Sequence, residues 1–131
     1  MTRRSTNFLS RLLTVLLALP LFAGAAVPTA DANGTWQLTV LDAGRTFTPT
    51  FILRQRGTEL MGTYRNSMGE QPATGTIDGN RVELKVQIKG SDGQERTVVY
   101  TGVIEGDNFT GEVKTSRGGG TFTSKRAPLP K

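Results

Sequence analysis

The sequence predicts an all-β protein, an eight-stranded antiparallel up-and-down β-barrel that follows an N-terminal signal peptide. From Gly34 onward, apolar residues recur at every second position, as they do in half-buried strands. Turn residues separate these runs every ~8–14 positions, a spacing typical of barrels and sandwiches. A basic and then apolar stretch precedes the first run, and this order is typical of an export signal.

Each alternating run predicts one strand. We expect the strands at residues 34–41, 46–54, 58–65, 72–78, 81–89, 96–105, 108–115 and 120–126. The turns at 78–80 (Asp-Gly-Asn) and 105–107 (Glu-Gly-Asp) are tight hairpin signals, because Gly and Asn accept a positive φ. Links this short make neighbouring strands pair antiparallel, so the strands should follow one another as a meander.

One face of each predicted strand is apolar and the other is polar or charged. A sheet this wide cannot leave its apolar face in water, so it must close on itself. A barrel satisfies this requirement, and a two-sheet sandwich is the alternative. We expect the interior to hold Trp36, Leu38, Val40, Phe47, Phe51, Leu53, Leu60, Gly62, Tyr64, Gly75, Ile77, Val82, Leu84, Val86, Ile88, Val98, Tyr100, Gly102, Ile104, Phe109, Gly111, Val113 and Phe122.

The first residues predict a cleaved signal peptide. Three arginines (Arg3, Arg4 and Arg11) give a basic start, and the apolar run at 12–22 is too short for a membrane span, which needs roughly 20 residues. Two small-residue sites follow, Ala-Gly-Ala at 23–25 and Ala-Asp-Ala at 30–32.

We expect cleavage after Ala32, because the first strand begins at Gly34; cleavage near Ala25 or Ala26 is the alternative. The chain then divides into a signal peptide at 1–32, a β-barrel domain at 33–127 and a short C-terminal tail at 128–131. This prediction makes the protein secreted or periplasmic, through ordinary secretion rather than the twin-arginine route.

Composition argues against several function classes. The chain has 16 Lys and Arg against 11 Asp and Glu; the leader holds three arginines and Asp31, which leaves 13 against 10, or +3, for the rest. This small mixed charge and the inward aromatics argue against a nucleic-acid partner. The chain has no His and no Cys, so the usual general base, thiol nucleophile and most zinc ligands are missing. We expect no enzyme activity, no catalytic residue, no metal and no cofactor.

The two ends of the predicted barrel carry the most specific signal. Gly34-Thr35-Trp36 opens the first strand, and Lys125-Arg126 ends the last strand. In a closed meander these strands are neighbours, so a cation can cover the indole face in a cation–π contact. We expect Gly34, Trp36, Lys125 and Arg126 to form a plug that closes one end of the barrel.

This pairing resembles the calycin superfamily, the lipocalins and avidins, which open with Gly-x-Trp and set a basic residue over that Trp. The matching residues are Gly34, Trp36 and Arg126 or Lys125, and the resemblance covers the strand plan from 34 to 126. Residues 60–64 are similar to the third avidin strand, where Tyr helps to hold biotin. Biotin sites of that family need further Trp residues, and this chain has one Trp, so biotin is not an expected ligand.

A second likeness is to a widespread kind of small exported bacterial barrel with Thr-Gly-Thr-x-Asp-Gly-Asn hairpins. Residues 74–80 and 120–122 carry this likeness. It implies no established activity.

Two interpretations of the interior remain open. Eight strands enclose a space that side chains just fill, or that holds one small ligand. Inward glycines either leave room for such a ligand or permit the coiling that closure demands. These glycines are Gly62, Gly75, Gly102 and Gly111.

We expect an exported, non-enzymatic accessory or interaction module with a largely packed core and a protein partner. The alternative is a lipocalin-like carrier of a small apolar ligand, held in the lumen by Trp36, Tyr64, Tyr100 and Phe109. The two Tyr hydroxyls are the clear polar groups on that face. The sequence predicts no membrane span in the barrel domain, and it specifies neither the ligand nor the oligomeric state.

Overall fold

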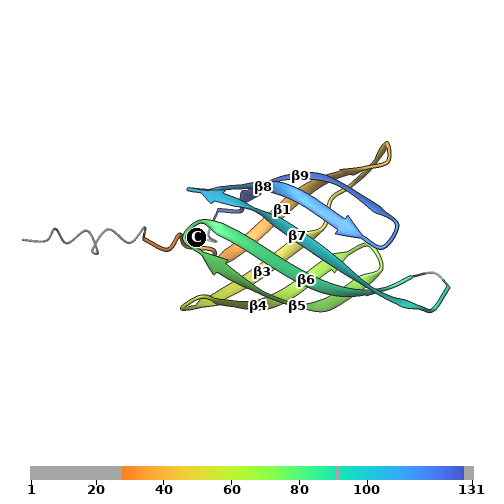
Figure 1. Cartoon of the computed structure of the whole chain (residues 1–131), viewed down its shortest axis with the longest axis horizontal. Helices are drawn as coiled ribbons and strands as arrows, with labels where there is room; N and C mark the ends of the chain where they lie inside the picture. Colours follow the sequence, from red (N-terminus) through yellow and green to blue (C-terminus); the bar gives the residue numbers. More distant parts are fainter. Residues whose placement is uncertain (1–27, 91, 129–131) are drawn as a thin grey trace, which may run out of the picture.

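The computed structural model describes residues 28–90 and 92–128. Most of the predicted leader (1–27) and residues 129–131 of the predicted tail lie outside these ranges. The described chain forms a single antiparallel sheet (Figure 1). Its strands are β1 (Gly34–Asp42), β2 (Arg45–Phe47), β3 (Thr50–Arg56), β4 (Glu59–Asn66), β5 (Gly69–Asp78), β6 (Arg81–Lys89), β7 (Glu95–Glu105), β8 (Asn108–Thr115) and β9 (Gly118–Arg126).

The sheet closes on itself because its first and last strands pair. Consecutive strands are neighbours from β3 to β9, and β1 joins β3 on one side and β9 on the other. Along the β1–β9 seam, Leu38 lies opposite Ser124. The predicted eight-stranded antiparallel meander barrel is confirmed, and the sandwich alternative is wrong.

The second barrel strand is broken into β2 and β3, whereas the sequence predicts one strand over 46–54. The break falls at Thr48 and Pro49, and proline has no N–H to donate to a ladder. Pairing nevertheless continues in one register, because Val40 lies opposite Phe47 and Gln37 lies opposite Thr50. β2 and β3 therefore form one interrupted strand of the barrel, which has eight strands by this count.

The tight turns have the expected chemistry. Gly79 and Gly106 adopt φ of 62° and 64°, in the left-handed region that glycine tolerates. The β1–β2 connection also has two residues with positive φ, Ala43 at 53° and Gly44 at 78°, which is the pattern of a type I′ hairpin turn. Ala43 pays a steric cost in that region because its Cβ crowds the backbone.

The predicted interior residues are buried or half-buried, with one exception. Phe47 is 43% exposed although it lies opposite the buried Val40, because the short β2 follows the β1–β2 turn, where the exposed Arg45 side chain covers one side of the ring, 5.6 Å from its centroid. Ser124 is missing from the predicted interior, yet it is buried opposite Leu38 and Phe109. Alternation along β9 therefore carries one hydroxyl into the core.

The inward glycines allow close approach of neighbouring strands. A Cβ at Gly62 would overlap the Ile52 carbonyl oxygen of β3, and a Cβ at Gly111 would overlap the Thr101 carbonyl oxygen of β7. Gly111 also faces Gly102 directly across the β7–β8 pair. These contacts favour the coiling interpretation, because the missing side chains are replaced by backbone and not by open space.

Candidate functional site

The plug end of the barrel is built around Trp36 and Arg126. These residues are direct partners across the β1–β9 seam, so their side chains share the inner face. The Arg126 guanidinium carbon lies 4.4 Å from the centroid of the indole ring, and Trp36 is fully buried. The indole Nε1 donates a hydrogen bond of 3.0 Å to the Ala32 carbonyl oxygen. The contact has cation–π geometry, in which the quadrupole of the ring attracts the cation.

The guanidinium of Arg126 also joins two segments that are distant in sequence. Its Nε donates to Asp107 Oδ1 at 2.9 Å, and its Nη2 donates to the Gly106 carbonyl at 2.9 Å, both in the β7–β8 turn. On the other side, Nη2 donates to the Asp31 carbonyl at 3.0 Å and Nη1 donates to the Asn33 carbonyl. One cation thus holds the chain before β1, the β7–β8 turn and the Trp36 ring together.

The structure places the other two predicted plug residues differently. Gly34 has φ of 126°, and a Cβ there would lie 3.2 Å from Arg126 Cδ, so glycine leaves room for the arginine stem. Lys125 is exposed and lies opposite Gln37 on the outer face. Its assignment to the plug is wrong, because adjacent strand residues point to opposite faces.

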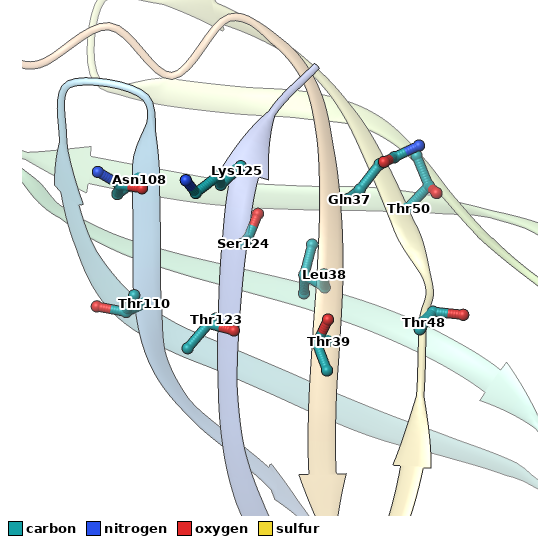
Figure 2. Close-up of a pocket in the computed structure, with 10 residues that line it drawn as sticks. All are labelled: Gln37, Leu38, Thr39, Thr48, Thr50, Asn108, Thr110, Thr123, Ser124 and Lys125. Atoms are coloured by element: carbon teal, nitrogen blue, oxygen red, sulfur yellow. The ribbon is translucent and has the colours of Figure 1, made fainter.

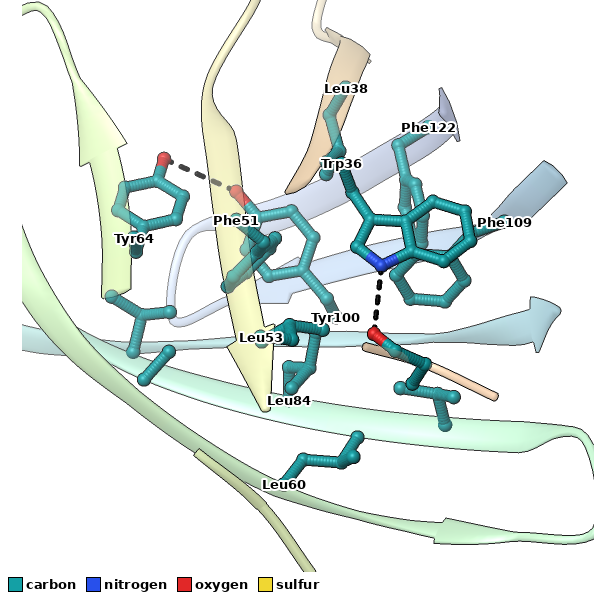
Figure 3. Close-up of a cluster of buried hydrophobic side chains, with 14 of the residues drawn as sticks. Trp36, Leu38, Phe51, Leu53, Leu60, Tyr64, Leu84, Tyr100, Phe109 and Phe122 are labelled. Carbon is teal, nitrogen blue, oxygen red and sulfur yellow. Dashed lines mark hydrogen bonds between the residues drawn. The ribbon is translucent and has the colours of Figure 1, made fainter. Parts of the chain in front are cut away.

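Aromatic rings occupy the lumen in a continuous row (Figure 3). Neighbouring centroids are 4.8–5.7 Å apart, each pair packs edge to face, and each ring is at most 5% exposed. In order of contact, the row consists of Trp36, Phe109, Phe122, Tyr100, Phe51 and Tyr64. The four residues predicted to bind a ligand therefore contact other core rings.

The two tyrosines form the polar end of this row. The Tyr100 hydroxyl donates to the Tyr64 hydroxyl at 3.3 Å (Figure 3). Burial raises the pKa of Tyr100 far above its usual range, and the neighbouring Tyr64 adds to the effect. Tyr100 therefore stays a neutral hydrogen-bonding group and does not act as a base near neutral pH.

A pocket of about 340 Å³ opens at the other end of β1, above Tyr64. We call it the mouth pocket; its lining residues are Thr46, Phe47, Thr48, Pro49, Tyr64, Asn66, Ser67 and Met68. Phe47 and Met68 form an apolar rim, with 43% and 69% of their surface exposed. Of the four residues predicted to hold a ligand in the lumen, Tyr64 lines this pocket, while Trp36, Tyr100 and Phe109 do not.

A larger, shallow depression of about 730 Å³ lies on the outside of the barrel, over β8, β9, β1 and the β2–β3 strand (Figure 2). We call it the outer depression. Its outward-facing side chains form two rows across these strands (Figure 2). One row holds Asn108, Lys125, Gln37 and Thr50, and the other holds Thr110, Thr123, Thr39 and Thr48. Among the described residues that line it, Lys125 alone is charged.

Sequence reasoning did not find the outer depression, because no single strand carries it. Thr110, Thr123 and Thr39 come from β8, β9 and β1, and only the pairing of the two chain ends makes them neighbours. The sequence feature that could have indicated the outer depression is the predicted closure of the meander, because closure places the outward residues of the first and last strands side by side.

Within residues 28–90 and 92–128, no three acidic side chains gather into a potential metal-binding group. Over the same residues, no helix is long and apolar enough to cross a membrane. Comparison with protein-family models gives no match, and comparison with curated protein sequences gives none either.

Proposed function

We propose that this protein is an exported, non-enzymatic β-barrel that acts as an interaction module through its outer surface. The observation that carries the proposal is the row of aromatic rings from Trp36 to Tyr64, which fills the centre of the lumen with side chains. A carrier of the lipocalin kind needs that space for its ligand. A packed barrel leaves its outer face and its rims for recognition.

The outer depression is the surface that best fits this role. Its hydroxyl and amide groups offer both donors and acceptors, and all of them except Thr48, at the break between β2 and β3, lie on strands. A partner that docks there desolvates few charges, which is the costly part of covering a polar surface. The partner expected from this chemistry is a protein segment that presents backbone or side-chain amides.

Kinship with calycins is part of the same proposal. It rests on Gly34, Trp36 and Arg126, whose contacts at the closed end have the arrangement that the resemblance implies. Descent from such barrels would explain why this barrel keeps the closing plug although its lumen is packed with side chains and not open for a ligand.

Site-specific cross-linking tests the surface directly, because the chain has no cysteine and each variant carries a single thiol. Thr123→Cys places the thiol in the outer depression, and Thr74→Cys is the matched control, an exposed threonine on β5. With a photoactivatable thiol label in the cell envelope, we expect one discrete product from position 123 and none from 74. Adding Thr110→Arg to the Thr123→Cys variant should abolish that product. Equal amounts of cross-linked product from positions 123 and 74 would refute the proposed surface.

The mouth pocket favours a second candidate function, the carriage of a small ligand. Its volume of about 340 Å³ lies at the lower end of the range for small-molecule sites, roughly 300–1,000 Å³. Phe47 and Met68 would cover an apolar body, and the Tyr64 hydroxyl would meet one polar atom. Isothermal titration with fatty acids and aromatic metabolites tests this, with Met68→Lys as the variant that should weaken binding.

A further inference from the structure

The residues just before β1 are built into the barrel. Ala30 donates its backbone N–H to the Gly79 carbonyl at 2.8 Å, and it packs against the core. Ala32 is fully buried, and its N–H donates to the Gln55 side chain at 2.7 Å. We call residues 30–33 the strap, because they cross the plug end of the barrel and contact both β3 and the β5–β6 turn.

The strap satisfies a buried donor of the plug. The indole Nε1 of Trp36 donates to the Ala32 carbonyl, and Trp36 has no exposed surface. A chain that began at Asn33 would leave this N–H buried without that acceptor, and an unpaired buried donor is strongly unfavourable. It would also leave the space of the Ala32 side chain unfilled.

The strap also supplies two of the hydrogen-bond acceptors of the Arg126 guanidinium. The carbonyls of Asp31 and Asn33 both accept hydrogen bonds from its guanidinium. Cleavage after Ala32 would remove the first acceptor and turn the Asn33 nitrogen into an ammonium beside that cation. The new positive charge would lie on the residue whose carbonyl binds the guanidinium, so it would repel Arg126, which would also have lost one acceptor.

The small residues of the strap have a packing role of their own. Ala30 and Ala32 face the core, while Asp31 and Asn33 are exposed, so the inward and outward alternation of β1 extends back through the strap. Small side chains fit there because Trp36 already fills the end of the barrel. The Ala-Asp-Ala sequence that resembles a cleavage site is thereby explained by packing.

We propose that the strap belongs to the mature barrel and that processing occurs upstream of it, at the Ala-Gly-Ala site at 23–25. This inference rests on the export that forms part of the proposed function. It replaces the expected cleavage after Ala32, which would cut between two residues that both bind the plug.

The decisive measurement is the intact mass and the N-terminal sequence of the exported protein. We expect the mature chain to begin at Ala26, and we expect Ala25→Arg to accumulate precursor, because the peptidase needs a small residue at that position. A mature chain that begins at Asn33, or normal processing of Ala25→Arg, would overturn the inference. Neither result would affect cross-linking from Thr123, so a failure here is distinguishable from failure of the interaction surface.

The single Trp gives a second readout. The protein should be compared in three forms, which begin at Ala26, Thr29 and Asn33. The Thr29 form is the control, because it is shortened but keeps the strap. We expect the Asn33 form to unfold at lower urea and to show red-shifted Trp36 emission, while the Thr29 form matches the Ala26 form. Identical midpoints and spectra for all three forms would refute a structural role for the strap.

Discussion

Arg126 lies directly opposite Trp36 across the seam that closes the barrel, with its guanidinium carbon 4.4 Å from the centroid of the indole ring. The pair joins the first strand of the barrel to the last. Arg126 also binds the strap and the β7–β8 turn, so three separate parts of the chain meet at this one side chain.

Substitutions in this pair should be strongly coupled. Trp36→Ala should lower the free energy of unfolding by about 3–5 kcal/mol, because it removes a large buried aromatic side chain. Arg126→Ala should cost about 2 kcal/mol, through the cation–π contact and the hydrogen bonds of the guanidinium. The double mutant should lose less free energy of unfolding than the sum of the two single mutants. Trp36→Ala alone already removes the cation–π contact, so that contact cannot be lost a second time. Urea melts measure all three values, and Lys125→Ala, on the outer face, is the control that should change little.

Ser124→Ala should leave stability unchanged or raise it by about 1 kcal/mol. Among the described residues the Ser124 hydroxyl has no hydrogen-bond partner, although it is buried opposite Leu38 and Phe109. Removing a polar group that is buried without a partner removes its desolvation cost. Thermal or urea unfolding measures the effect, and a clear loss of stability would mean that the hydroxyl has a partner such as a buried water.

Ala43→Asn should stabilise the β1–β2 turn. Ala43 has φ of 53°, a left-handed conformation that costs an ordinary L-residue about 1–2 kcal/mol and that Asn adopts more readily. We expect an increase of about 0.5–1 kcal/mol in the free energy of unfolding, a typical gain for correcting a turn residue. Ala43→Val is the opposing control, since a β-branched residue tolerates this region poorly; equal stability of the two variants would contradict the account.

Stability should fall in alkali, and Tyr100 should account for part of the fall. Burial raises the pKa of Tyr100 in the folded state above its ordinary value of 10.0. The folded state then holds the phenol proton while the unfolded state releases it, so the loss begins near pH 10 and deepens as pH rises further. Each unit of pH above that point should cost up to about 1.4 kcal/mol. Urea melts across this range should give a shallower pH slope for Tyr100→Phe, and an unchanged slope would refute the assignment.

Much of the fold follows from alternation alone. An apolar face on every strand requires closure, and closure makes β1 and β9 neighbours, so the proximity of Trp36 and Arg126 could be derived from the sequence. Alternation also separates Arg126 from Lys125, and it would have placed Ser124 inside had it been followed past Phe122. Pro49 could have indicated the break between β2 and β3, since proline interrupts a ladder.

Other features depend on position along the barrel axis, which a period of two does not encode. Phe47 has the right face, but it lines the mouth pocket next to the β1–β2 turn, and 43% of its surface stays exposed. The strap was hidden for a different reason: small inward residues at Ala30 and Ala32 look the same as a peptidase site. The outer depression needed the register of three strand pairs, which alternation does not supply.

Side chains of the barrel itself fill the centre of the lumen, and we propose that recognition occurs outside it. Native mass spectrometry of the protein purified from its own host tests this most directly, since gentle ionisation keeps a bound ligand in place. We expect the mass of the polypeptide without a small-molecule adduct. A stoichiometric small molecule that leaves only on denaturation would contradict the account and establish the barrel as a carrier.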